Sequence, residues 1–340
     1  MASSLTNTEV LTDVLDAFKT KFPVLSAIST DFSNAEARKG DTIRTRIHSL
    51  PTPADYGASD GYKNGASNSN DLATDVDITL DKHKHVPIKV DYLEQISTKR
   101  DLYNEVIGNV AFALGNQIFT DIMGHVGKDQ FSYEIAGTVS ASDFDALNSA
   151  NKVLNLNGAS PSGRFGIVNS DVFAILNKDE RIASGDYHGQ IKGAEAYGVL
   201  NGISGFEAIY EVPALPTNGQ DLTGFFADKS AIMLATRLPS DMDALANRLG
   251  VPSIAKTEIV SDADSGLSFM GITAQDPHTY DLFTTVTLLY GIKAGGSWTG
   301  NSADATTQTN RAGVRLCSSA QSNDPSQAGG EGALITNTIS

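Results

Sequence analysis

The segment that comes nearest to a phosphate-binding loop is Gly158-Ala-Ser-Pro-Ser-Gly163. Such a loop needs Lys and then Ser or Thr directly after its second glycine, because the lysine reaches the phosphates and the hydroxyl binds Mg²⁺. Here Arg164 and Phe165 occupy those positions, and the segment follows a helical pattern and precedes a strand pattern, which reverses the required order. We therefore predict a turn between a helix and a strand, and no nucleotide site.

Two further clusters place possible metal ligands at short spacing. Asp262 and Asp264 have the spacing of a calcium loop, but the third oxygen ligand and the closing glutamate are missing. His83 and His85 share one face of a predicted strand, beside two lysines whose ammonium groups disfavour a cation. We predict an acidic surface turn for the first cluster and solvated charge on a strand edge for the second.

The sequence offers no catalytic motif. It contains no G-x-S-x-G, H-E-x-x-H or G-x-G-x-x-G pattern, and its single cysteine, Cys317, belongs to no set with zinc spacing. The sequence therefore predicts no cofactor, no metal and no catalytic residue. Among enzymes, the alternative that stays open is an α/β enzyme whose hairpin forms a mobile lid.

Composition narrows the class of protein. Of 340 residues, 25 are Lys or Arg and 40 are Asp or Glu, which gives a net charge of −15 and argues against electrostatic nucleic-acid binding. Charged residues make up 19%, below the usual share of roughly 25%. No secretory signal is recognisable, and no apolar run reaches the roughly 18 residues of a membrane span. We expect a soluble protein, made in a reducing cytoplasm, that covers part of its surface with a partner.

Two alternating segments flank a polar stretch in the first third of the chain. Residues 41–47 and 75–81 alternate with period two, the pattern continues to Val90, and residues 51–72 are almost without aliphatic side chains. We predict a long antiparallel hairpin over 41–92, with strands near 42–48 and 75–90 and its tip at 51–72. Such a polar tip is tolerable when the hairpin projects from its own body.

Two amphipathic helices are expected. Residues 6–20 carry apolar side chains at helical spacing and end before Pro23. Residues 100–126 hold one broad apolar face, which predicts a long helix whose Leu102, Val106, Val110 and Leu114 pack on a sheet of the same subunit. Further strands and short helices are predicted at 130–139, after Ser142, at 164–168, 171–179, 205–210, 224–227 and 281–292, followed by a polar tail beyond 295.

The order of these parts is similar to that of tailed-phage major capsid proteins. The resemblance is carried by the runs Val76 to Leu93, Gly163 to Leu176, Gly202 to Leu215, and Phe226 to Ile232 read with Arg237-Leu-Pro239. It implies an α+β fold with an N-arm, an extended loop hairpin, a peripheral domain with a long spine helix, and an axial domain. Encapsulins and the floor domains of herpesvirus capsids share this fold.

Residue ranges for these parts follow from the resemblance. It implies an N-arm at 1–40, an extended loop at 41–92, a peripheral domain from 93–139 and 276–295, an axial domain at 140–275 and a C-terminal extension at 296–340. The extended loop would lie over a neighbouring subunit. The contact candidates in the arm and loop are Val10, Val14, Phe18, Arg44, Arg46, Tyr56, Tyr62 and Lys63, with Asp75 and Asp77 as local partners for the arginines.

The resemblance also implies a function and partners. The chain is expected to be a structural subunit that forms hexamers and pentamers of an icosahedral head in the virion, assembled in the host cytoplasm. The head would enclose double-stranded DNA without sequence-specific binding, together with portal and scaffold or decoration proteins, and without a membrane. The alternative is an encapsulin-type shell of a cellular nanocompartment.

Overall fold

The computed structural model describes residues 23–48, 56, 73–90, 102–128, 130–131, 133–136, 144–179, 195–196, 199–213, 215–239, 255–262, 267–275, 282–295, 312–318 and 337–338. The chain divides into two compact units. The first unit takes residues 1–43, 78–122 and 233–293, and the second takes 44–77, 123–232 and 294–340. Each unit is described by itself.

The first unit is built on a six-stranded sheet. Its strands are, in spatial order, β1 (Ser29–Ala37), β11 (Ile232–Pro239), β14 (Leu282–Ala294), β13 (Leu267–Gln275) and β12 (Ala255–Asp262), with β4 (Lys82–Val90) also paired to β14. The β1–β11 pair is parallel, whereas the pairs β12–β13, β13–β14 and β14–β4 are antiparallel. A short 3₁₀ helix, η1 (Pro23–Ala27), precedes β1.

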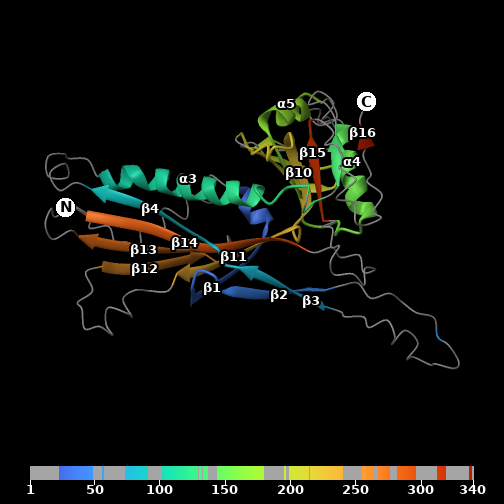
Figure 1. The fold of residues 1–340 in the computed structure, drawn as a ribbon. Helices are drawn as coiled ribbons and strands as arrows, with labels where there is room; N and C mark the ends of the chain where they lie inside the picture. Colours follow the sequence, from blue (N-terminus) through green and yellow to red (C-terminus); the bar gives the residue numbers. More distant parts are fainter. Residues whose placement is uncertain are drawn as a thin grey trace. The chain divides into compact units, whose positions relative to one another are not determined.

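The long helix α3 (Leu102–Met123) runs along this sheet (Figure 1). Its 22 residues correspond to a length of about 33 Å. Val110, Leu114, Ile118 and Ile122 are buried, which confirms the predicted apolar face where the side chains are described. Those of Leu102 and Val106 lie outside the described part.

The predicted hairpin is confirmed for the pairing of its first strand with residues 73–79, and is wrong for residues 82–90, which pair elsewhere. Strands β2 (Thr42–His48) and β3 (Ala73–Thr79) form a two-stranded sheet, here called the ribbon. The expected strand 75–90 breaks at Leu80 and Asp81, and its second part is β4, which pairs with β14 instead. The break arises because Leu80 is buried against Ile78, Ala235 and Leu289, and its backbone bonds to Gly40 and Asp41.

The second unit is built on an eight-stranded sheet with two helices. In spatial order its strands are β16 (Asn337–Thr338), β5 (Glu134–Ala136), β15 (Gly313–Cys317), β10 (Leu222–Asp228), β6 (Arg164–Val168), β9 (Phe206–Glu211), β8 (Val199–Ile203) and β7 (Glu195–Ala196). Helices α4 (Phe144–Leu156) and α5 (Ser170–Lys178) contribute buried side chains to its core. Asn169 caps α5 by accepting a hydrogen bond from the Val172 amide.

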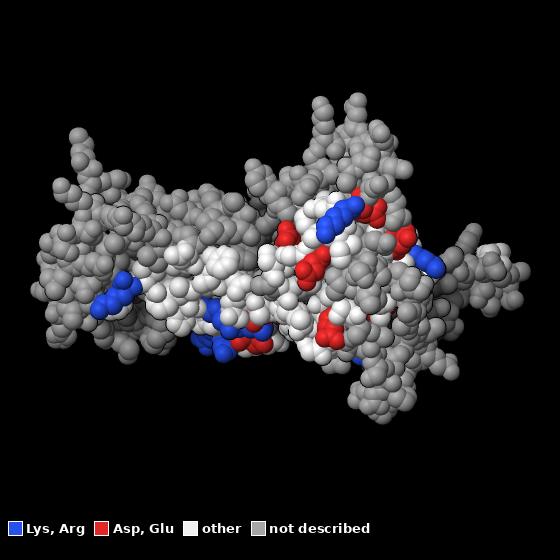
Figure 2. Space-filling model, turned by 90° about the horizontal axis from the view of Figure 1, so that it is seen from above, with Lys and Arg blue, Asp and Glu red and all other residues white. Residues whose placement is uncertain are grey.

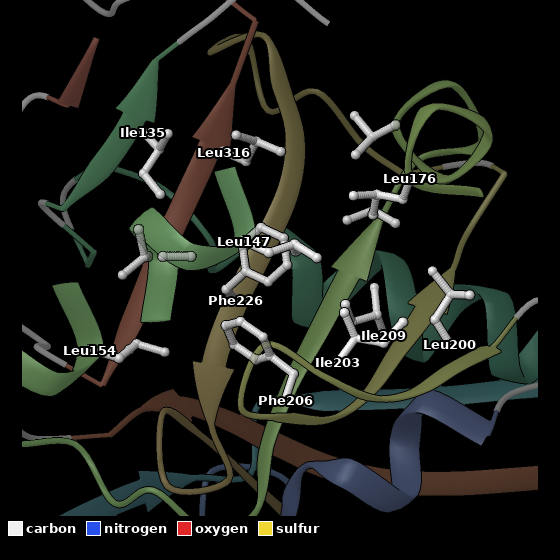
Figure 3. Close-up of a cluster of buried hydrophobic side chains, with 14 of the residues drawn as sticks. Ile135, Leu147, Leu154, Leu176, Leu200, Ile203, Phe206, Ile209, Phe226 and Leu316 are labelled. Atoms are coloured by element: carbon white, nitrogen blue, oxygen red, sulfur yellow. The ribbon is translucent and has the colours of Figure 1, made fainter. Parts of the chain in front are cut away.

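One hydrophobic cluster joins these elements (Figure 3). Leu147 and Leu154 come from α4, Leu176 comes from α5, and the sheet supplies Phe206 and Phe226, whose ring centroids lie 5.2 Å apart. Burial of such side chains stabilises the unit by about 1.5–3 kcal/mol each.

The domain ranges expected from the sequence, with an axial domain at 140–275, stay a prediction. Within the two compact units, strands β11, β12 and β13 lie in the sheet of the first unit. The polar tail after residue 295 contributes a strand to the fold, because β15 lies between β5 and β10 in the sheet of the second unit. β15 belongs to this sheet because its alternating apolar residues Val314 and Leu316 complete the core of the second unit.

Candidate functional site

The ribbon carries the charged residues that the sequence suggested for contacts. The Arg44 Nε donates to Asp77 Oδ1 at 2.9 Å, and its Nη1 lies 3.9 Å from Asp75 Oδ2, with all three side chains largely exposed. The hydrogen bond to Asp77, followed by the charges of both carboxylates, raises the pKa of Arg44. The prediction that Asp75 and Asp77 are local partners of Arg44 is confirmed.

The other predicted contact residues are placed only in part. Tyr56 is 67% exposed, and Arg46 lies in β2 with its side chain outside the described part. The remaining candidates, Val10, Val14, Phe18, Tyr62 and Lys63, lie outside the described residues. Their role between subunits stays a prediction.

A polar group links α3 to the sheet of the first unit. Asp121 accepts hydrogen bonds from the Tyr290 hydroxyl at 2.6 Å and from Gln117 Nε2 at 3.0 Å, and Lys82 Nζ lies 3.7 Å away. Burial, and then the contact with Asp121, raises the pKa of Tyr290, so its hydroxyl stays a donor over the physiological range. The arrangement connects Lys82, the first residue of β4, to α3. It is suited to holding the helix against the sheet rather than to transferring a proton.

A buried arginine organises strand β15 of the second unit. Arg315 in β15 is 0% exposed; its Nη2 bonds Glu134 Oε2 at 2.9 Å, its Nε bonds the Phe131 carbonyl at 2.7 Å, and its Nη1 bonds Gln220 Oε1 at 2.9 Å. A charge this deeply buried is tolerated only with such a set of partners. Sequence reasoning missed this group, although the alternation of Gly313–Cys317 inside a polar tail could have indicated a strand.

The single cysteine belongs to the same strand. Cys317 is buried, and burial raises the pKa of its thiol to about 11. The reactive form of cysteine is the thiolate, which a pKa that high suppresses at neutral pH. Cys317 is therefore a packing residue.

The glycine-bounded segment 158–163 is a turn between α4 and β6, as predicted. The Arg164 Nε donates to the Ser160 carbonyl and its Nη2 to the Ala159 carbonyl, both at 2.7 Å, while Nη1 bonds Asn151 Oδ1. Because its guanidinium is buried and already bonded to the turn, Arg164 holds the turn closed and is not presented to a phosphate.

The histidine pair lies on β4, as the sequence indicated. His83 Nε2 is 2.7 Å from Thr287 Oγ1, and partial burial, followed by the charges of His85 and Lys39, lowers the pKa of His83. In the part of the chain that the structure describes, no three His, Cys, Asp or Glu side chains come together as metal ligands. Among the helices of that same part of the chain, none has both the length and the apolarity that a membrane span requires.

Comparison with known proteins gives a match by structure alone. No protein-family model matches the sequence, and no curated protein is significantly similar to it. The capsid of cyanophage P-SCSP1u matches with a TM-score of 0.54 at 11% identity, over 87% of each chain. The capsid of Ralstonia phage GP4 matches at 0.53 and 11% over 88% of each chain, and that of Helicobacter pylori bacteriophage KHP30 at 0.53 and 12%, over 85% of this chain and 87% of that one.

These matches define the fold. The chain has the α+β fold of tailed-phage major capsid proteins, as the order of parts in the sequence predicted. These three structures come from phages of cyanobacteria, Ralstonia and Helicobacter, and the low identity makes the likeness one of fold.

Proposed function

We propose that this chain is a major capsid subunit, a structural protein without enzymatic activity that assembles into an icosahedral phage head around double-stranded DNA. The observation that carries the proposal is the capsid fold, which matches over 85–88% of the chain. Copies would join as hexamers and pentamers, and many weak contacts in a closed lattice would sum to a stable particle.

The charge of the chain supports the proposed cargo. A shell of subunits that each carry a net charge of −15 would repel DNA, so a genome packaged inside would not bind to its inner surface. On the described part of one face, Figure 2 shows acidic and basic side chains interspersed among neutral ones. DNA would therefore be enclosed without sequence-specific binding. Portal and scaffold or decoration proteins are the further partners we propose, in a virion assembled in the host cytoplasm.

The ribbon is the proposed point of contact between subunits. Among the described strands, β2 and β3 pair with each other and join neither larger sheet. A two-stranded hairpin alone is marginally stable in water, so packing on a neighbour would complete it. The N-arm would add a second contact.

An encapsulin-type shell is the second candidate, because the fold is shared. The phage head is favoured by the phage capsid structures that match. Electron microscopy of particles formed by the purified chain tests both: phage-sized shells support the head, and small cargo-filled shells support the alternative.

Replacing Arg44 by Ala should weaken assembly without weakening the subunit. Arg44 is exposed, so its loss should leave the melting temperature unchanged, while the ribbon loses the positive charge that faces Asp75 and Asp77. We expect fewer particles by sedimentation, with Lys152→Ala on the exposed face of α4 as the matched control. A lower melting temperature together with a normal particle yield would contradict this role.

A further inference from the structure

Strand β12 forms one margin of the sheet of the first unit (Figure 1). Among the described strands it pairs with β13 alone, so no described strand bonds to the backbone N–H and C=O groups of its outer edge. Such an edge is a template on which a further strand can pair. The outer edge of β12 is therefore a candidate contact surface.

The strands at the margins of this sheet differ in regularity. β1 has a register shift between Ser33 and Glu36 in its pairing with β11, and β4 contains Pro87, which has no N–H to donate. Bulges and prolines are features by which proteins keep edge strands from pairing with another chain. β12 has neither, because its eight residues contain no proline and pair with β13 in one unbroken register. Of the described margins, β12 is thus the most regular template.

An apolar side chain near the middle of β12 is exposed. Ile259 is 48% exposed, whereas Met270, its partner across the ladder, is 3% exposed. The subunit therefore covers the β13 side of this pair and leaves the β12 side in contact with water. A further strand that placed an apolar residue beside Ile259 would remove part of this surface from water, which favours association.

The charges on β12 complement the same strand read in the opposite direction. Two identical strands that pair antiparallel across a two-fold axis place residue i opposite residue j, and j opposite i. Centred on Ile259, this register places Lys256 opposite Asp262 and Thr257 opposite Ser261, once on each side of the axis. Opposite charges and hydroxyl pairs at such positions stabilise a ladder.

The other central residues fit less well. A centre at Lys256, Glu258 or Val260 would place two like charges opposite each other, which is destabilising. A centre at Thr257 would pair Lys256 with Glu258, but over a shorter stretch of β12. The register centred on Ile259 therefore combines the longest complementary pairing with contact between the two exposed isoleucines. β13 carries no charged residue that would compete for these pairs.

We propose that β12 pairs edge to edge with β12 of a second copy of this chain, antiparallel and centred on Ile259, so that one sheet continues across a two-fold axis. The self-complementary charges identify the occupant as a second copy. The inference rests on the proposed function, since an icosahedral shell brings copies together about two-fold axes. One pair of strands is a small interface, so the contact is weak alone and adds to the others in a closed lattice.

Disulfide formation at the axis tests the register. Residues opposite each other in an antiparallel ladder have Cα atoms about 4.5–5.5 Å apart, within the range of about 4.4–6.8 Å that a disulfide spans. In the full-length chain under particle-forming conditions, Ile259→Cys should give a covalent dimer on mild oxidation, measured on a non-reducing denaturing gel. The native Cys317 is buried, so wild type should give none. Mass spectrometry should locate the disulfide between the two copies of position 259.

Matched variants separate this register from chance collision. Glu258→Cys, which would pair with itself in a register shifted along the strand, should give several-fold less dimer than Ile259→Cys. Lys152→Cys, on the exposed face of α4, should give no more dimer than wild type. Circular dichroism checks that each variant is folded.

A charge exchange tests the same contact without a cross-link. Lys256→Glu places a carboxylate opposite Asp262 and should lower the particle yield several-fold by sedimentation. Adding Asp262→Lys to that variant restores opposite charges and should recover the yield. A loss through misfolding of the subunit would not be rescued in this way. Failure of the double variant to recover, with both variants folded, would contradict the pairing.

The outcomes separate this inference from the proposed function. If wild type forms shells and Ile259→Cys gives no dimer, or gives no more than Glu258→Cys, the inference is wrong and the capsid role stands. If Ile259→Cys forms the dimer but wild type never closes into shells, the β12 contact is supported and the capsid role fails. A disulfide that joins position 259 to Cys317 overturns the inference, because another segment then lies at this edge. A chain that stays monomeric and gives no dimer overturns both.

Discussion

Replacing Arg315 by Ala should unfold the second unit. The change leaves Glu134 buried without its partner and removes donors from the Phe131 carbonyl and from Gln220. Breaking a buried ion pair from one side costs about 3–5 kcal/mol, a large part of the 5–15 kcal/mol of a typical domain. We expect insoluble protein on expression, or a urea midpoint far below that of wild type.

A double variant tests whether the unpaired charge of Glu134 causes the loss of stability in Arg315→Ala. Arg315→Met combined with Glu134→Leu removes both charges, and should be more stable than Arg315→Ala because no buried charge is left alone. Lys152→Ala, on the exposed face of α4, should stay within about 0.5 kcal/mol of wild type. If Arg315→Ala unfolds at the wild-type urea concentration, β15 is not part of the core.

Replacing Val110 by Asp should prevent the first unit from folding. Val110 is 2% exposed on the buried side of α3, so the substitution places a charge among apolar side chains. An unpaired buried carboxylate costs several kcal/mol. Soluble protein measured after expression should fall to a small fraction of the wild-type amount.

The neighbouring residue provides the control for that substitution. Asn109 lies on the exposed side of the same helix, and Asn109→Asp adds the same charge to solvent with little cost. Equal loss of soluble protein in both variants would show that charge on α3, rather than burial at position 110, is responsible.

Local signals in the sequence were sufficient for several elements. Strand β6 has the predicted bounds, because a short apolar run ends at a residue that caps the next helix, Asn169. Helix α3 was recognisable from its periodic apolar face. These patterns are set by neighbours along the chain, which a sequence displays directly.

Pairings between distant segments were not predictable in the same way. The same period-two alternation occurs in β3 and, after Lys82 and Lys84, again in β4, so it gives no sign that one strand pairs with β2 and the other with β14. β15 is five residues inside a polar tail, and its partners Glu134 and Gln220 lie 181 and 95 residues away. For the contact candidates, the local pairing of Arg44 with Asp75 and Asp77 was predicted correctly, whereas the role of all the candidates between subunits stays a prediction.

The central claim is that copies of this chain close into a shell, and electron microscopy of the purified full-length protein tests it most directly. The proposed function predicts closed particles of uniform, phage-head size, whose wall resolves into hexamers and pentamers of the fold described above. Discrete small oligomers or monomers, under conditions where the protein is folded by circular dichroism, would contradict it.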